Sequence, residues 1–179
     1  MLVDPRSSKQ LPSIELAILS DRVLEALVTG SIDRAGDAFG RPLPPFLLED
    51  SWLWNMRLDQ LREDPKCAPW LVRVVIDADS SEIVGHAGFH GPPDANGTVE
   101  VGYTIHPSHR LRGYATATLG ALIDYARIDP NVRVVRASVS PDNAGSLKTI
   151  AAYGFAEVGE QMDEIDGLEL IFERPVRST

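Results

Sequence analysis

The spacing of apolar and polar side chains changes several times along the first part of the chain. Residues 14–18 alternate between apolar side chains and polar or small ones, which is the period-two pattern of a half-buried strand. A helix with apolar positions on one face follows over residues 20–30 and ends at a glycine. A loop rich in glycine and proline over residues 40–45 precedes a second helix, predicted over about residues 48–61. The pattern therefore predicts one strand and two helices in this part of the chain.

The rest of the chain has the periods of a sheet crossed by helices. Two strands, at 70–76 and 82–89, flank a polar turn as in a hairpin, and a third strand follows over 98–105. The remaining predicted elements are a helix over 116–127, a strand over 132–139, a helix over 144–152 and closing strands over 155–158 and 168–172. Three meandering strands that lead into a β–α–β crossover predict an α/β (α+β) fold. We expect a mixed, mostly antiparallel sheet of six to seven strands with helices on both faces.

Composition narrows the class of protein. A length of 179 residues fits one domain, expected over residues 13–175 after a loose lead at 1–12. The apolar runs are too short for a membrane span and the first ten residues carry no apolar signal segment, so we expect a cytoplasmic protein without a membrane partner. The single cysteine, Cys67, excludes an internal disulfide and a cysteine-built metal site, and we expect no metal. A net charge of −9 argues against a nucleic-acid partner and mildly favours a cationic one, such as an amine.

The segment 105–116 carries the most informative chemistry. Gly113 and Ala115 lead from a loop into an amphipathic helix, where backbone N–H groups and the helix dipole point at one spot and suit a phosphate. Small residues let the anion approach the amides, and Arg110 and Arg112 can add charge-assisted contacts. The spacing alone is equally compatible with an ordinary strand-to-helix turn that carries exposed arginines.

Several motifs together resemble a known family. Residues 110–115 (Arg-x-x-Gly-x-Ala) match the Gln/Arg-x-x-Gly-x-Gly/Ala signature of the GNAT superfamily of N-acetyltransferases. Residues 100–107 (Glu-x-Gly-Tyr-x-Ile-x-Pro) resemble the fourth strand of that family, and residues 143–146 (Asn-x-x-Ser), followed by Tyr-Gly-Phe at 153–155, resemble its second cofactor motif. The resemblance covers about residues 13–174 and is greatest to the branch that contains the ribosomal-protein N-terminal acetyltransferases.

The resemblance implies acetyl-coenzyme A as the cosubstrate and assigns positions to it. Backbone amides of residues 111–116 hold the pyrophosphate, and strand residues 103–105 pair with the pantetheine arm and polarise the thioester carbonyl. Asn143 and Ser146 contact the arm near its thiol end. The implied cofactor-binding residues are Tyr103, Thr104, Ile105, Arg110, Leu111, Arg112, Gly113, Tyr114, Ala115, Thr116, Asn143 and Ser146.

An amine attacks a thioester only as the free base, so the reaction needs a proton acceptor and a proton donor for the leaving thiolate. Glu100, on the cofactor-binding strand, is the first candidate for the base, with a solvent-facing strand residue as the alternative. The best-studied family members carry a tyrosine as the acid, where this chain has Ile150, and a glutamate on the preceding strand, where it has Ser138. Ser146 is then the candidate donor, unless it serves only as a cofactor contact or a helix-cap partner.

The acceptor side of the site is less clearly marked. Trp52 and Trp54 fall in the part of this fold that usually builds the acceptor pocket, where aromatic walls can stack on a substrate, although core packing is an equal alternative. His90 shares a strand face with His86 and is expected in the substrate groove or in strand packing rather than on a metal. Tyr153 is expected to pack in the core.

The resulting hypothesis is an N-acetyltransferase that moves an acetyl group from acetyl-CoA to a primary amine by direct attack. The acceptor can be a protein N-terminus, a polyamine, an amino-sugar or another small amine. A non-catalytic acyl-CoA-binding module and a transferase of longer acyl groups are the alternatives, and a homodimer is possible.

Overall fold

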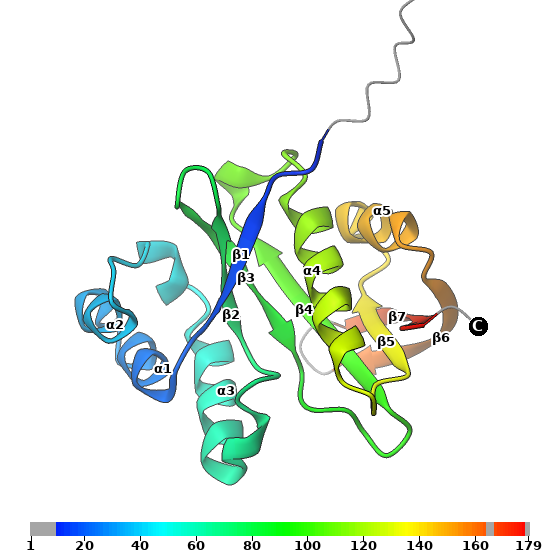
Figure 1. The fold of residues 1–179 in the computed structure, drawn as a ribbon, viewed down its shortest axis with the longest axis horizontal. Helices are drawn as coiled ribbons and strands as arrows, with labels where there is room; N and C mark the ends of the chain where they lie inside the picture. The colour runs from blue at the N-terminus through cyan, green and yellow to red at the C-terminus, as the bar shows by residue number, and fades with distance from the viewer. Residues whose placement is uncertain (1–9, 164–166, 178–179) are drawn as a thin grey trace, which may run out of the picture.

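The structure, a computed structural model, describes residues 10–163 and 167–177 (Figure 1). Most of the predicted N-terminal lead, residues 1–9, therefore lies outside the described residues. The strands are β1 (Ile14–Ile18), β2 (Arg73–Asp77), β3 (Ile83–Phe89), β4 (Thr98–Ile105), β5 (Val134–Val139), β6 (Ala156–Asp163) and β7 (Gly167–Pro175). The helices are α1 (Asp21–Val28), α2 (Ile32–Phe39), α3 (Ser51–Glu63), α4 (Tyr114–Ile128) and α5 (Ala144–Ala152).

The seven strands of the described residues form one sheet in the order β1-β2-β3-β4-β5-β7-β6. Neighbouring strands run antiparallel, except that β4 and β5 pair in parallel through the crossover helix α4. This is the mixed, mostly antiparallel sheet that the sequence pattern predicts, and its seven strands lie at the upper end of the expected number.

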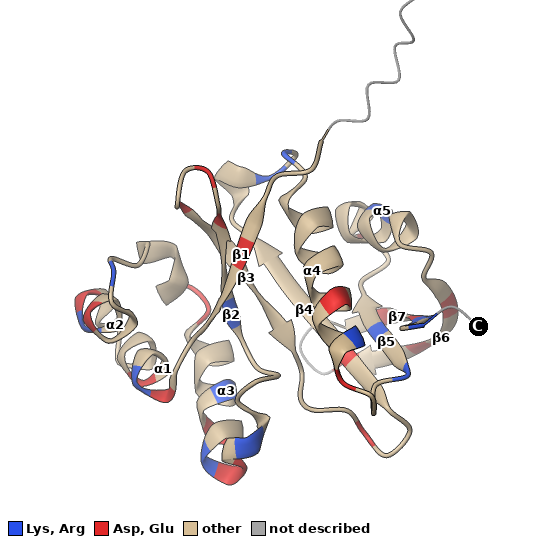
Figure 2. Cartoon of the chain, in the orientation of Figure 1, with Lys and Arg blue, Asp and Glu red and all other residues tan. Residues whose placement is uncertain are grey.

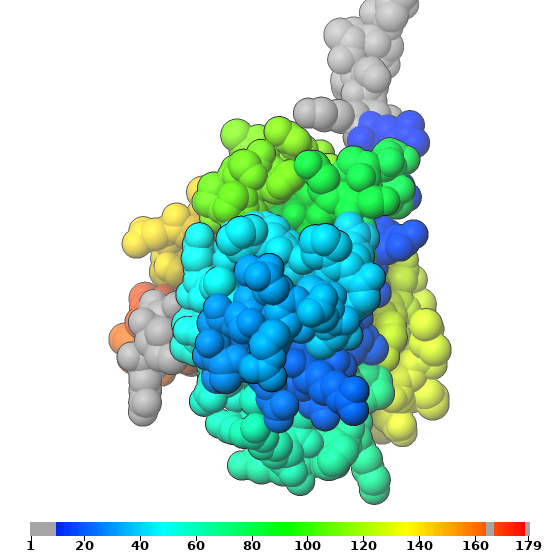
Figure 3. Space-filling model, turned by 90° about the vertical axis from the view of Figure 1, so that its left-hand side faces the viewer, coloured from blue at the N-terminus to red at the C-terminus, as the bar shows by residue number. Residues whose placement is uncertain are grey.

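Helices cover both faces of the sheet, as predicted. On one face α1 and α3 pack Leu24, Leu27 and Trp54 against Val74 and other residues of β2 and β3. On the opposite face α4 packs Leu119, Leu122 and Ile123 against the sheet. Successive β2 residues serve the two cores alternately, because the side chains of a strand point to opposite faces. Figure 3 shows α1, α2 and α3 as a continuous outer layer over the first face.

The structure adds one helix to the sequence prediction and shifts the bounds of several other elements. Helix α2 was not predicted, because it is short, holds Gly36 in its interior and carries charged residues among few apolar ones. Its end at Gly40, with a φ of 87°, has the left-handed conformation typical of a helix C-terminus. Strand β2 begins at Arg73 rather than at residue 70, and β6 runs to Asp163, beyond the expected end at residue 158.

Helix α3 faces the core with a different side from the one that its apolar residues suggest. Trp54 is fully buried, and its Nε1 donates a hydrogen bond to the carbonyl of Leu47. Trp52 and Met56 are 51 % and 41 % exposed. The hydrogen bond of the indole lets the core accept Trp54 without leaving a buried donor unpaired.

Many of the charged residues lie on the helices α1, α2 and α3 and on the loops (Figure 2). Basic residues mark the loop that precedes α4, which contains Arg110 and Arg112. Within the described part of the chain, no helix has the length and apolar character needed to cross a membrane.

The two tryptophans of α3 give a test of this packing. Trp54→Ala should lower the free energy of unfolding by about 3–5 kcal/mol, because it leaves a large cavity in the core. Trp52→Ala removes a half-exposed ring from the same helix and should change it by less than about 1 kcal/mol. Urea unfolding followed by circular dichroism measures both, and equal losses for the two variants would contradict the assigned helix face.

Candidate functional site

Strands β4 and β5 separate partway along their length, and the site lies at this separation. The parallel pairing covers only Thr98–Glu100 of β4, opposite Val134–Arg136 of β5. Beyond Glu100, β4 continues to pair with β3 through Val101–Ile105, but not with β5. The side of β4 that faces β5 therefore offers backbone groups without a strand partner over residues 101–105. Such an exposed strand edge can pair with an extended ligand.

The loop from β4 to α4 presents backbone amides at the head of this opening. Gly113, the N-cap residue of α4, has a φ of 94° and provides no side-chain cap, so the amides of the first turn remain available to a ligand. Leu111 also has a positive φ, 61°, and is 98 % exposed. Arg110 folds back, and its Nε donates to the carbonyl of Ile105 at 3.0 Å. The loop thus has the geometry of an anion site at a helix N-terminus.

Two tyrosine hydroxyls fix the N-terminal turn of α4. Tyr114 is buried and donates to Asp77 Oδ2 at 2.6 Å, which ties the first residue of α4 to the end of β2. This hydrogen bond, with further ones from Ser80, lowers the pKa of Asp77 to about 2. Tyr153 donates to the carbonyl of Thr116 at 2.8 Å and passes over Gly120, where any side chain would collide with the hydroxyl. The position of the loop is therefore set by both β2 and α5.

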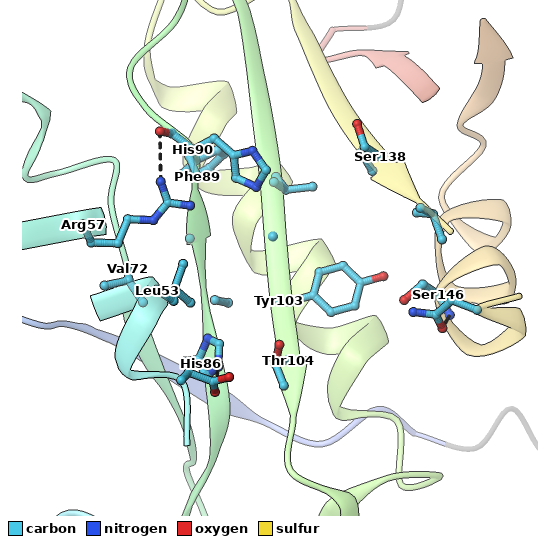
Figure 4. Close-up of a pocket in the computed structure, with 18 of the residues that line it drawn as sticks. Leu53, Arg57, Val72, His86, Phe89, His90, Tyr103, Thr104, Ser138 and Ser146 are labelled. Carbon is cyan, nitrogen blue, oxygen red and sulfur yellow. Dashed lines mark hydrogen bonds and ion pairs between the residues drawn. The ribbon is translucent and has the colours of Figure 1, made fainter. Parts of the chain in front are cut away.

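A cleft of about 490 Å³ opens beside the separated strands (Figure 4). Its walls come from α3, β3, β4, the end of β5 and the start of α5. It is lined by Trp52, Arg57, His86, His90, Gly102, Tyr103, Thr104, Ser138, Asn143, Ser146 and Glu169, among others. The cleft brings together residues from both of the sequence motifs around Tyr103 and Asn143.

At one end of the cleft, Tyr103 crosses from β4 toward α5 (Figure 4). Its hydroxyl is buried and forms no hydrogen bond with the described residues. Burial raises the pKa of Tyr103, and the neighbouring hydroxyls of Ser146 and Thr149 oppose the increase. Asn143 caps α5 by accepting a hydrogen bond from the Ser146 amide at 3.0 Å, and Ser146 lines the cleft. Two hydroxyl donors, on Tyr103 and Ser146, therefore meet at this end.

The Glu100 carboxylate lies just behind the cleft wall. Glu100 Oε1 accepts a hydrogen bond from the hydroxyl of Ser138 at 2.7 Å and lies 3.7 Å from Nδ1 of His90. Ser138 and His90 both line the cleft. Burial lowers the pKa of His90 and the nearby Glu100 charge opposes that change, while half of the His90 side chain remains exposed. Glu100 and His90 can accept a proton from a group in the cleft, directly or through the Ser138 hydroxyl or a water molecule.

A second acid–histidine pair lines the same cleft. His86 Nε2 lies 2.9 Å from Asp50 Oδ2, and the His86 ring stands edge-on to Trp54 with ring centroids 4.9 Å apart. The described residues contain no group of three or more histidine, cysteine or acidic side chains that could hold a metal ion.

The structure corrects one of the predicted site residues. Trp54 cannot form a wall of the acceptor pocket, because its side chain is fully buried beneath His86 in the core. Trp52 and His90 do line the cleft. Tyr153 is held by its bond to Thr116 at the helix contact between α4 and α5.

Several features of the cleft were not predicted from the sequence. These are the Tyr103 hydroxyl, the Ser138–Glu100 hydrogen bond, the Asp50–His86 pair and the buried Arg57. Each depends on contacts between residues distant in the chain. The sequence feature that bears on these contacts is the two-residue period of the strand, which places Glu100 and Gly102 on the same face of the sheet.

Comparison with known proteins agrees with this architecture. Residues 19–156 match a family described as an acetyltransferase (GNAT) domain. The chain therefore belongs to the GNAT acetyltransferase family. An uncharacterised N-acetyltransferase of Bacillus subtilis, YjdG, is 39 % identical over 82 residues, which cover 46 % of this chain and 49 % of YjdG. The chain matches about half the length of its curated relatives.

Solved structures share the fold across nearly the whole chain. RimJ of Mycobacterium smegmatis, determined in complex with CoA-disulfide, has a TM-score of 0.64 at 21 % identity and covers 90 % of this chain and 81 % of its own. Ribosomal-protein-S5-alanine acetyltransferase of Vibrio fischeri has a TM-score of 0.64 at 18 % identity, and the match covers 93 % of this chain and 94 % of that protein. A spermidine N-acetyltransferase chimera from Vibrio cholerae and human sequences also has a TM-score of 0.64, at 15 % identity, with 91 % and 95 % covered. At these identities the likeness shows the fold.

The Tyr114–Asp77 hydrogen bond predicts a dependence of stability on pH. The folded-state pKa of Asp77, about 2, lies below its ordinary value of 3.8, so the bond stabilises the fold fully above pH about 4 and loses this effect as the pH falls toward 2. Tyr114→Phe should therefore be less stable than the wild type at pH 6, by a margin that shrinks between pH 4 and pH 2.

Urea unfolding at a series of pH values measures this margin. Tyr125→Phe is the matched control, because the Tyr125 hydroxyl donates to the Pro69 carbonyl, which does not titrate. A margin for Tyr114→Phe that is constant with pH would contradict the assignment.

Proposed function

We propose that the protein is an N-acetyltransferase that moves an acetyl group from acetyl-CoA to a primary amine. The observation that carries the proposal is the unpaired edge of β4 over residues 101–105, which leads directly to the uncapped N-terminus of α4. One feature suits an extended arm and the other suits the pyrophosphate to which that arm is attached. Membership of the GNAT family and the N-acetyltransferase names of the curated relatives support the same activity.

The residues around the opening fit acetyl-CoA. Amides of residues 111–116 would hold the pyrophosphate, and Arg112, which is exposed in the loop, would add charge. The backbone of Tyr103–Ile105 would pair with the pantetheine arm. The buried hydroxyl of Tyr103, which forms no hydrogen bond with the described residues, fits a ligand acceptor at the thiol end. When bound, acetyl-CoA supplies a thioester that a neutral amine can attack.

Glu100 is the proposed proton acceptor. Its carboxylate reaches the cleft through Ser138 and lies beside His90, so a proton leaving the acceptor amine can pass to Glu100 through Ser138 or a water molecule. Ser138 stands where well-studied family members carry a glutamate, and its hydrogen bond brings the carboxylate of the adjacent strand to the same place. The side chains of this chain therefore provide a base despite the substitution.

Ser146 and Tyr103 are the proposed proton donors to the leaving thiolate. Both hydroxyls face the opening between β4 and α5, and Ile150, at the position of the usual tyrosine, is buried in the core. Tyr103 supplies a phenol from β4 in place of one from α5. The Tyr103 hydroxyl carries its proton at neutral pH, because the ordinary pKa of tyrosine is about 10 and burial raises the pKa of Tyr103 further.

Glu100→Gln tests the base. The change keeps the shape of the side chain but removes its capacity to accept a proton, so kcat should fall by about 100-fold or more, while the Kd for acetyl-CoA stays within about twofold. Thiol release against pooled amines measures kcat, and calorimetry measures Kd. Glu157→Gln, on the exposed strand β6, is the control. Wild-type turnover in Glu100→Gln would remove Glu100 from the mechanism.

Gly113→Val tests the phosphate loop. A side chain at Gly113 is strained at a φ of 94° and would press on Pro12 and Leu11, at 3.1 and 3.3 Å from its Cβ, so acetyl-CoA binding should be lost. Gly40→Val carries the same left-handed strain at the end of α2, away from the loop, and should bind acetyl-CoA normally. Unchanged acetyl-CoA binding by Gly113→Val would contradict the assignment of this loop to the pyrophosphate. Binding by the wild type without thiol release from any amine would favour an acyl-CoA-binding module.

A further inference from the structure

Arg57 is a buried cation in the wall of the cleft. It lies on α3, is only 8 % exposed and lines the cleft on the side away from α5 (Figure 4). Its Nη1 donates to Gln60 Oε1 at 2.7 Å and to the carbonyl of His90 at 3.2 Å. Both acceptors are neutral. The remaining N–H groups of the guanidinium, on Nε and Nη2, form no hydrogen bond with the described residues.

Two arginines of the sheet, Arg73 and Arg136, have compensating contacts that Arg57 lacks. Arg73 donates to three backbone carbonyls and lies over the ring of Tyr125, 4.4 Å from its centroid. Arg136 forms a two-pronged ion pair with Glu173, at 2.9 and 2.6 Å. Arg57 has neither an aromatic ring beneath it nor a carboxylate beside it among the described residues. Burial lowers the pKa of Arg57, as it does that of Arg73, so the two arginines differ in their contacts rather than in this shift.

The acidic side chains around the cleft do not supply the missing counter-charge. Among the described residues none of them forms an ion pair with Arg57, and three have other partners: Asp50 has His86, Glu169 has Gln161 and Glu100 has Ser138. A buried cation without a counterion is costly, and a ligand that brings a negative charge to it recovers that cost on binding.

We propose that Arg57 is an anion-binding subsite and that the acceptor is an amine that also carries a carboxylate. This inference rests on the proposed transferase function and specifies its substrate class. His90 lies between the two groups that would bind the acceptor. Its carbonyl accepts a hydrogen bond from Arg57 at 3.2 Å, and its Nδ1 lies 3.7 Å from Glu100 Oε1. The amine of the acceptor lies near Glu100, and the carboxylate of the acceptor accepts hydrogen bonds from the Nε and Nη2 groups of Arg57. The planar fork of a guanidinium matches a carboxylate well.

The same arrangement disfavours a polyamine. A second ammonium group extending from Glu100 along the cleft would meet Arg57, which has no counterion among the described residues. Like charges at short range in a partly buried site repel strongly. An acceptor with one amine and one carboxylate places each charge opposite its complement. The cleft therefore selects by charge along its length.

The test compares amines that differ only in charge. Glycine, β-alanine and γ-aminobutyrate vary the spacing between the amine and the carboxylate. Each is compared with the amino amide in which a neutral carboxamide replaces the carboxylate, and spermidine represents the polyamines. Calorimetry measures their binding to the protein loaded with coenzyme A, and thiol release from acetyl-CoA measures their turnover. We expect at least one acid to be preferred over its amide by about 10- to 100-fold, the size of a charge-assisted contact.

Variants of Arg57 connect that preference to the residue. Arg57→Gln should abolish the preference and Arg57→Lys should retain part of it, while acetyl-CoA affinity stays unchanged in both. Arg57→Lys keeps the buried charge, so it can be measured in place of Arg57→Gln if the glutamine variant does not fold. Arg62→Gln, at a side chain 58 % exposed on the same helix, is the control and should behave as the wild type.

The outcomes separate the subsite from the transferase. The inference is overturned if no acid binds better than its amide, if spermidine is preferred, or if Arg57→Gln keeps the preference. Acids that bind through Arg57 without any thiol release would support the subsite and contradict the transferase proposal. Turnover of amides or spermidine in place of acids would support the transferase and contradict the subsite.

Discussion

The arrangement of this molecule depends on the loss of pairing between β4 and β5 after Glu100. Up to that residue the two strands share a parallel ladder, and beyond it β4 stays with β3 while β5 stays with β7. Backbone groups that would otherwise be paired within the sheet are left for a ligand. The Arg136–Glu173 ion pair holds β5 to β7 at the point of separation, so the opening belongs to the frame of the sheet rather than to a mobile loop.

The elements around the opening are positioned by a small number of polar contacts. Tyr114 ties the start of α4 to Asp77 on β2, Tyr153 ties α4 to α5, and Asn143 caps α5 so that Ser146 faces the cleft. These contacts fix the amide-rich loop and the hydroxyl-bearing helix relative to the exposed edge of β4. The cleft contains the proposed acceptor site. There the negative charge of Glu100, the proposed base, and the positive charge of Arg57, the proposed anion subsite, lie on either side of His90.

The fold could be predicted well from the sequence, because it depends on local patterns, whereas the assignment of residues to the cofactor stays a prediction. Strand and helix periods, the glycine before α4 and the Asn-x-x-Ser turn are all short-range features. The acceptor side was predicted less well, because it depends on tertiary contacts. Trp52 and Trp54 are two residues apart on one helix, and only packing decides that Trp54 enters the core. In the same way, the pattern around Arg57 gives no sign that its guanidinium is buried without a carboxylate.

Amide hydrogen exchange with and without acetyl-CoA tests whether the edge of β4 and the N-terminus of α4 together form the cofactor site. We expect new protection on binding at residues 101–105 and 111–116, with a smaller effect at residues 143–146. Protection confined to other parts of the sheet, or no change at these amides at saturating acetyl-CoA, would contradict it.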